Sequence, residues 1–236
     1  MNILVTNDDG IDSIGIVKLA KAAKKFGNVW VVAPDGQRSC ISHSLTYGRP
    51  IRLTRCDFPV EGVEAYKSNG TPADIARVCA AGFLKDKVDV ILAGINDGYN
   101  ISRDIQYSGT VAAAMEASLF GIHAIAFSQG SYEFGDVVDK YLDGIIEECI
   151  NKPLDVNKIW NVNFPACKLE DCKGIKRDCK VSTDTFYDDG YSEEQVEEGV
   201  YDYNIIQKRI WEAEEGSDLA AVIDNYISIG VVNNIG

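Results

Sequence analysis

The sequence predicts an α/β fold built around a parallel sheet, because strand-like and helical patterns alternate along the chain. Residues 3–5 form a short apolar run. Apolar side chains then recur at helical spacing from Ile16 to Phe26, and a second apolar run over residues 29–33 stops at Pro34. A strand, a helix and a second strand in such a short stretch form the unit from which parallel sheets are built.

The alternation continues as far as residue 165. Thr71 and Pro72 are a cap residue and a first-turn proline, so we expect a helix to begin there and to run through Leu84. The pattern also predicts a strand over residues 88–95, a helix over 111–120, a strand over 124–127 and an amphipathic helix over 136–150.

One segment departs from this alternation. Two strand-like runs lie within residues 51–67, on either side of Asp57-Phe58-Pro59. We expect them to form a β-hairpin, over about residues 46–68, that protrudes from the main sheet.

The last third of the chain has a different character. From Cys167 onward it is acidic, tyrosine-rich and strand-like only in patches, with a helix expected near residues 217–226. We therefore divide the chain into a catalytic core over residues 1–165 and a C-terminal extension over residues 166–236. A segment rich in aromatic side chains usually packs against something, here the core or a partner subunit.

Charge and composition exclude several classes of function. The formal net charge is −13 and no run is rich in lysine or arginine, so a nucleic acid polymer is not an expected partner. A small phosphorylated ligand remains compatible, because a bound divalent cation reverses the local field. No apolar run approaches the roughly 18 residues that span a bilayer, and residues 1–9 do not resemble a signal peptide. We expect a cytoplasmic protein without a membrane partner.

Polar side chains follow the ends of three predicted strands. Asp8 and Asp9 follow the first strand, Ser39 lies in the loop after the second, and Asn96 follows the strand at 88–95. Ligands of open parallel sheets bind beyond the carboxyl ends of the strands. Each residue alone is ordinary turn or loop chemistry, but together they are hard oxygen donors that suit Mg²⁺, Mn²⁺ or Ca²⁺ better than zinc. We expect one divalent metal ion per subunit at this edge.

A second group of residues favours an anion. Ser108, Gly109 and Thr110 precede a predicted helix, where free backbone N–H groups and the helix dipole favour a phosphate. The plain alternative is N-capping of that helix by Ser108 or Thr110. A cation site and an anion site on one sheet edge fit a phosphate ester held between them.

Several short motifs resemble those of the SurE survival-protein family, and they occur in one order over most of the chain. They are Asn7-Asp8-Asp9-Gly10; Arg38-Ser39 with Ser42-His43-Ser44-Leu45-Thr46; Gly70-Thr71-Pro72-Ala73-Asp74; Gly94-Ile95-Asn96 with Gly98 and Asn100; Tyr107-Ser108-Gly109-Thr110-Val111; and Asn161-Val162-Asn163-Phe164-Pro165.

The resemblance implies a Rossmann-like core, with helices on both faces of a parallel sheet. It also implies a divalent-metal phosphatase that hydrolyses nucleoside 5′- and 3′-monophosphates, with short polyphosphate as a further candidate substrate. The metal is then held by Asp8, Asp9, Ser39 and Asn96, and Asn7 joins Ser108, Gly109 and Thr110 at the substrate. The resemblance further implies a homodimer or homotetramer, assembled through the hairpin and an exchanged C-terminal region.

Within that scheme Asp8 and Asp9 are the catalytic residues, and Asp8 is the better candidate to position or deprotonate the attacking water. Two positions depart from the family pattern. Cys40 stands where the family usually has glycine or alanine, and Ser102 stands where its glycine-rich run ends in glycine. We expect these departures to affect loop conformation and substrate preference.

Rival chemistries stay open at the level of the sequence. An aspartyl-phosphate mechanism is disfavoured, because it needs carboxylates on alternate residues and Asp8 and Asp9 are adjacent. A Cys40 nucleophile with His43 as its base is a weaker alternative. A non-catalytic mononucleotide sensor on the same fold is the alternative from another class. Cys167, Cys172 and Cys179 lie close in sequence, but without C-x-x-C spacing we expect free thiols.

Overall fold

Strand β1 (Asn2–Thr6) lies inside the main sheet of the computed structural model, between β2 (Asn28–Pro34) and β5 (Val90–Asp97). Both neighbours run parallel to it. The structure describes residues 1–84 and 88–234. The helix α1 (Ile14–Ala23) connects β1 to β2 and begins at Ser13, whose side chain caps it by accepting from the N–H of Ile16.

The predicted alternation of strands and helices is present up to β7, and further strands and one helix follow it. The remaining elements are β3 (Leu53–Cys56), β4 (Glu64–Ser68), α2 (Pro72–Val78), β6 (His123–Gln129), α3 (Gly109–Leu119), α4 (Gly135–Ile150), β7 (Lys158–Phe164), β8 (Ile175–Lys176), β9 (Gly190–Glu197), β10 (Val200–Ile206), α5 (Asp218–Ile223) and β11 (Ile227–Asn233). A π-helical turn (Cys79–Phe83) follows α2, and 3₁₀ turns occupy Ser102–Tyr107, Tyr132–Phe134 and Leu169–Asp171.

The strand order places a topological switch point beside β1. In the described part of the chain the main sheet reads β3-β4-β2-β1-β5-β6-β7-β11-β8. β2 is added on one side of β1, and the later strands β5 and β6 are added on the other side. Ligands bind at such a reversal, outside the carboxyl ends of the strands. The residues at the carboxyl ends of β1, β2 and β5 are therefore the expected ligand-binding residues.

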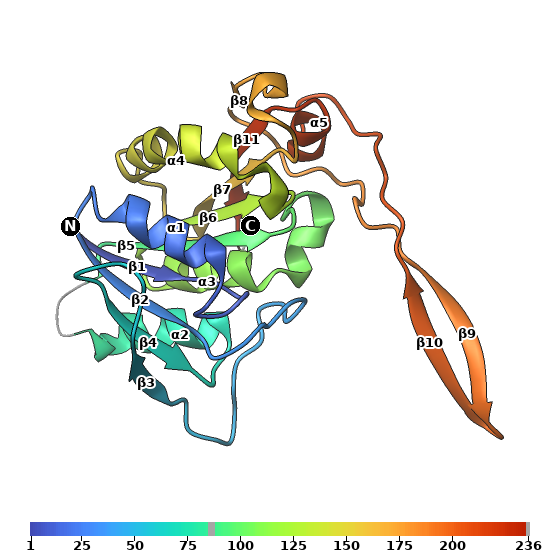
Figure 1. Cartoon of the computed structure of the whole chain (residues 1–236), viewed down its shortest axis with the longest axis horizontal. Helices are drawn as coiled ribbons and strands as arrows, with labels where there is room; N and C mark the ends of the chain where they lie inside the picture. The colour runs from blue at the N-terminus through green and yellow to red at the C-terminus, as the bar shows by residue number, and fades with distance from the viewer. Residues whose placement is uncertain (85–87, 235–236) are drawn as a thin grey trace.

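Helices cover both faces of the sheet, as the resemblance implies (Figure 1). One buried cluster joins apolar residues of α1 and α4 to one face, and a second cluster joins those of α2 and α3 to the other. Successive residues of β1 alternate between the clusters, since Ile3 and Val5 belong to the first and Leu4 belongs to the second. The fold is a mixed, mostly parallel α/β sheet.

The position expected for the protruding hairpin is wrong. β3 and β4 do pair antiparallel, but β4 also pairs parallel with β2 from Trp30 to Pro34. The predicted hairpin therefore extends the edge of the main sheet, because β2 offers an unpaired edge to β4. The hairpin that protrudes is β9–β10 in the C-terminal extension, which projects away from the core (Figure 1).

The rest of the extension returns to the core. β11 pairs antiparallel with β7 from Lys158 to Asn163, and β8 pairs with β11. α5 packs Leu219 and Val222 into a third cluster with Tyr99, Ile101 and Phe186. Within the described residues, no helix combines the length and apolar character needed to cross a membrane.

Candidate active site

The turn after β1 carries Asp8 and Asp9 at the carboxyl end of the strand. Gly10 has a φ of +100°, and a methyl group added there would lie 3.2 Å from the backbone of Gly36 in the loop after β2. Glycine is therefore needed both for the bend and for the close approach of that loop. The side chain of Asn7 shapes the same turn, because it accepts from the Gly10 N–H and donates to the Gly10 carbonyl and to Ser13 Oγ. A direct contact between Asn7 and substrate stays a prediction.

The carboxylate of Asp8 is buried against the N-terminus of α3. Only 4% of Asp8 is exposed, and Thr110 Oγ1 donates a hydrogen bond to its Oδ1. A methyl group at Gly109 would lie 2.9 Å from Asp8 Oδ2, so glycine permits this packing. Burial raises the pKa of Asp8 to about 6, the hydrogen bond from Thr110 opposes the rise, and the charge of Asp9 adds to it. A buried carboxylate of this kind gains from any cation that reaches it.

Asp9 is tied to the end of β5, which carries Asn96. The backbone N–H of Asp97 donates to Asp9 Oδ2 at 3.0 Å. The hydroxyl of Tyr132 lies 3.3 Å from the same oxygen and donates to the Ile95 carbonyl at 2.8 Å. Burial raises the pKa of Asp9 as well, against these hydrogen bonds. The side chain of Asp9 is thereby held toward the end of β5.

The loop that carries Ser39 is also joined to this turn. The N–H of Arg38 donates to the backbone carbonyl of Asp8 at 2.7 Å, and Ser39 is exposed. Asn96 donates from its Nδ2 to the Gly98 carbonyl at 2.9 Å, which leaves its side-chain oxygen available as a ligand. The loop that carries Ser39, the end of β5 with Asn96 and the start of α3 therefore all meet the Asp8–Asp9 turn.

The donor set fits a hard divalent cation. Among the described residues, none of the ion pairs includes Asp8 or Asp9, so two adjacent carboxylates stand without a basic partner. No group of three His, Cys, Asp or Glu residues in that part of the chain could hold a metal. The predicted set is of another kind, since a hydroxyl and an amide would complete the two carboxylates. Asp8, Asp9, Ser39 and Asn96 remain the predicted ligands.

At the start of α3 the N-capping interpretation is confirmed for Ser108, and the phosphate interpretation stays a prediction. Ser108 caps the helix, since its Oγ accepts from the N–H of Val111 at 3.0 Å. Thr110 is fully buried and donates to Asp8. The first backbone N–H groups of this helix of 11 residues lie beside the Asp8 carboxylate, and the Ser108 side chain occupies that of Val111. A phosphate there would be shared between α3 and a cation at Asp8.

The cysteine-nucleophile alternative lacks its base. His43 Nε2 lies 2.8 Å from Glu116 Oε2, so the imidazole is paired with a glutamate. In the part of the chain that the structure describes, no hydrogen bond joins His43 to Cys40, which is exposed. The seven cysteines are free thiols, and burial raises the pKa of Cys167 to about 11, so that thiol stays protonated.

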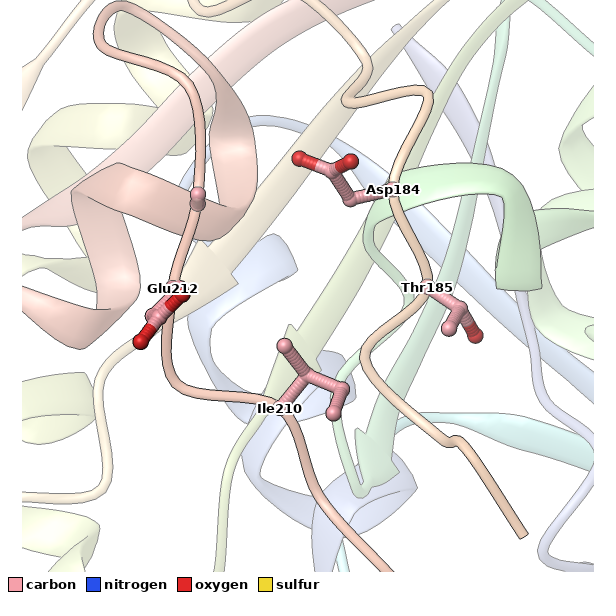
Figure 2. Close-up of a pocket in the computed structure, with 5 residues that line it drawn as sticks. Asp184, Thr185, Ile210 and Glu212 are labelled. Carbon is pink, nitrogen blue, oxygen red and sulfur yellow. The ribbon is translucent and has the colours of Figure 1, made fainter.

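A surface hollow of about 430 Å³ lies at the base of the hairpin and not at the strand ends. Figure 2 shows Asp184 and Thr185 on the segment that leads to β9, opposite Ile210 and Glu212 on the segment that returns from β10. None of the residues that line the hollow is one of the predicted site residues, and the hollow does not lie beyond the carboxyl end of a strand of the main sheet. The strand-end site is therefore the better candidate.

Comparison with known proteins agrees with the motifs. The family described as "Survival protein SurE" matches residues 3–187. The chain belongs to the SurE family. This SurE chain is 39% identical over 236 residues to the protein named "5'-nucleotidase SurE" of Clostridium botulinum (strain Langeland / NCTC 10281 / Type F), with 97% of this chain and 91% of the relative covered.

Two further similarities extend over nearly the whole SurE chain. A "5'-nucleotidase SurE" of Thermoanaerobacter sp. (strain X514) is 38% identical over 235 residues, which cover 97% of this chain and 90% of that protein. The solved structure titled "Crystal Structure of Sure Protein from Aquifex aeolicus" superimposes with a TM-score of 0.84 at 34% identity, covering 100% of this chain and 94% of that one.

The two departures from the SurE motifs have a common geometry. Cys40 has a φ of +54° and Ser102 a φ of +55°, so both occupy the left-handed region. That region favours glycine, and a residue with a Cβ there costs roughly 1–2 kcal/mol. The backbone at Cys40 and Ser102 therefore adopts a conformation that glycine adopts more easily, at a cost in conformational free energy. Ser102 is held by its N–H, which donates to Asp218 Oδ2 at 3.0 Å.

Several supporting residues of this SurE site were not assigned roles from the sequence. Asn161 and Asn163, two apart on β7, both donate to the backbone carbonyl of Asn100 at 2.9 and 3.0 Å. Asn163 also accepts from the Asn100 N–H. They fix the loop that follows Asn96. Their alternation on one strand was the available signal, since side chains two apart share a face.

Proposed function

We propose that this chain is a divalent-metal-dependent phosphomonoesterase that hydrolyses nucleoside 5′- and 3′-monophosphates to nucleoside and phosphate. Short polyphosphate is a further candidate substrate. The observation that carries the proposal is the buried Asp8 carboxylate, packed against the N-terminus of α3 beside Asp9 and without a basic partner among the described residues. The 5′-nucleotidase name of the curated relatives supports the same class.

The residues divide the work as follows. Asp8, Asp9, Ser39 and Asn96 would hold one Mg²⁺, Mn²⁺ or similar ion, which supplies charge neutralisation and activation of water. The first N–H groups of α3 and the Ser108 hydroxyl are the proposed donors to the phosphate oxygens, whereas the Thr110 hydroxyl donates to Asp8. Thr110 keeps Asp8 Oδ1 fixed by donating to it, which leaves Oδ2 to orient or deprotonate the attacking water.

Metal removal tests this function directly. We expect hydrolysis of nucleoside monophosphates and of p-nitrophenyl phosphate to disappear after exhaustive EDTA treatment and to return with Mn²⁺ or Mg²⁺. Full activity after that treatment would refute the metal mechanism. If the protein binds nucleotides but does not hydrolyse them in the presence of either metal ion, the result would instead support the sensor alternative. A nucleotide panel then gives the ratio of 5′ to 3′ activity.

We propose a homodimer or homotetramer in the cytoplasm. All residues of β9 and β10 are exposed, and they include large apolar side chains such as Tyr191, Tyr203 and Ile205. Two strands with no core beneath them are marginally stable alone, so a partner subunit is the natural cover. Light scattering at micromolar concentration tests this, because a single species at 25.8 kDa would refute assembly.

A further inference from the structure

Tyr187 belongs to the C-terminal extension, yet its hydroxyl reaches the candidate site. A methyl group at Gly98 would lie 3.8 Å from the Tyr187 hydroxyl oxygen and 3.7 Å from Asn96 Nδ2. The hydroxyl and a predicted metal-binding side chain therefore border the same small space. The neighbouring loop is close too: burial is the main cause that raises the pKa of Tyr187, and the Asp104 carboxylate and the Cys40 thiol add to the rise.

The hydroxyl of Tyr187 has no hydrogen-bond partner among the residues that the structure describes, although the residue is half-buried. The Tyr187 hydroxyl is not one of the fully buried polar atoms that lack a partner, so it faces solvent beside the site. The hydroxyls of Tyr99 and Tyr132, in contrast, bond to Ala166 N–H and to the Ile95 carbonyl. The Tyr187 hydroxyl is thus a polar group beside the site that is still available to a ligand.

The backbone that presents Tyr187 is firmly held. Asp104 Oδ2 accepts from the N–H of Phe186 at 2.8 Å and from that of Tyr187 at 3.0 Å. Thr185 Oγ1 donates to the same carboxylate, 3.1 Å from its Oδ1. Phe186 is 1% exposed and packs edge-on against Tyr99. A side chain presented by a fixed backbone can contact a ligand with little loss of conformational entropy.

We propose that the Tyr187 hydroxyl binds the sugar of the nucleoside monophosphate, so that the C-terminal extension supplies a substrate-binding residue to the core site. This inference rests on the proposed function and adds a residue that selects nucleotides over other phosphate esters.

The surroundings of Tyr187 favour a neutral, polar part of the ligand. The charges nearby are mixed, because Arg209 lowers the pKa of Tyr187 while Asp104 and Asp189 raise it. Such a setting does not favour a second phosphate. A phenol donates and accepts one hydrogen bond each, as sugar hydroxyls do. The phosphate is expected elsewhere, at the Asp8–Asp9 turn beside the start of α3.

Replacing Tyr187 with phenylalanine tests the inference, because the ring and its packing on Phe186 are kept. We expect the KM for adenosine 5′-monophosphate to rise about 3- to 10-fold, the range for one lost hydrogen bond. The kcat should stay within about twofold, and so should both constants for p-nitrophenyl phosphate, which has no sugar. Tyr226→Phe is the matched control, since Tyr226 lies over Lys176 at 4.4 Å, on the segment that leads into β11.

Two results would overturn the inference: an unchanged KM for the nucleotide, or an equal rise for both substrates. If the wild-type protein hydrolyses neither compound, the proposed function fails, and the inference is then decided by calorimetric titration with adenosine and with inorganic phosphate. Weaker adenosine binding in Tyr187→Phe, with unchanged phosphate binding, would support it. Equal adenosine affinities in the variant and the wild type would refute it.

Discussion

Arg77 Nε donates a hydrogen bond to Glu116 Oε1 at 2.7 Å, across the contact between α2 and α3. The Glu116 side chain is 2% exposed, and its other oxygen lies 2.8 Å from His43 Nε2. One buried carboxylate therefore joins α2, α3 and the loop that carries Ser39. The N–H of Ser42, in the same loop, donates to the Tyr107 carbonyl just before α3, which reinforces the link.

Replacing Glu116 with glutamine should destabilise the fold and loosen this loop. Glutamine has the shape of glutamate but leaves the Arg77 charge without its partner, so we expect a loss of about 1–3 kcal/mol in the free energy of unfolding. Urea denaturation measures it. Asp139→Asn is the control, because the ion pair between Lys18 and Asp139 lies at the surface and contributes at most about 1 kcal/mol. Equal losses in the two variants would contradict a special role for Glu116.

Replacing Gly109 with alanine should damage the site. The new methyl group would lie 2.8 Å from Asp8 Cβ, so Asp8 or the start of α3 must move. We expect a loss of stability of about 1–3 kcal/mol, and a loss of activity larger than unfolding explains. Gly144→Ala is the control, since no atom lies within 4 Å of a methyl group there, and an exposed helix position should gain about 0.5–1 kcal/mol. A fully active Gly109→Ala protein would show that the close packing of Gly109 on Asp8 is not needed for activity.

Replacing Asp8 with asparagine should abolish activity while stabilising the metal-free protein. Because burial raises the pKa of Asp8 to about 6, the folded state holds its proton more tightly than the unfolded state. Stability therefore falls as pH rises from the unfolded value toward 6 and stays low above it. Asparagine removes that cost, which we expect to be on the order of 1–3 kcal/mol at pH 8.

Thermal unfolding in EDTA at pH 5 and pH 8 checks this prediction. The wild-type protein should lose more stability than Asp8→Asn between these two values. Added Mn²⁺ should raise the melting temperature of the wild type and not that of the variant. A variant that is less stable than the wild type at pH 8 in EDTA would show that Asp8 has a structural partner.

Deleting the protruding hairpin should change assembly without unfolding the core. β9 and β10 pair only with each other in the described structure, and none of their residues is buried. Replacing residues 190–206 with a short Gly-Ser linker should therefore leave the melting temperature of the subunit fold nearly unchanged and lower the mass measured by light scattering. An unchanged oligomer would assign assembly to another surface.

Truncation within the extension has a different expected outcome. β11 is part of the main sheet, so a chain that ends near residue 180 lacks a core strand and leaves the edge of β7 open. An open apolar strand edge is a template for aggregation. Comparing the two deletions separates the role of the β9–β10 hairpin from that of β11.

The sequence predicted the elements whose signal is local. The helix from Ile16 and the strands at 29–33 and 88–95 follow from side-chain periodicity, and the start of α2 follows from Thr71 and Pro72. The pairing of β4 with β2 could not be predicted in this way, because it joins segments that are distant in sequence. The return of β11 to β7 is non-local for the same reason.

The candidate site shows the same division. Asp8, Asp9, Ser39 and Asn96 could be proposed from their places after strand ends, because the geometry of parallel sheets brings such ends together. Glu116 and Tyr187 could not, since each meets the site through a contact that only the tertiary fold creates. A glutamate in a helix and a tyrosine in an irregular segment carry no local signal of function.

The place of β11 also bears on how this protein is synthesised. A ribosome releases β7 long before residues 227–233, so the outer edge of β7 has no intramolecular partner while the intervening segment is translated. That segment includes the whole β9–β10 hairpin, whose exposed apolar side chains leave the ribosome during the same interval. Nascent chains with open edges are prone to mispairing. β7 therefore gains its outer neighbour in the sheet only after the whole β9–β10 hairpin has been synthesised.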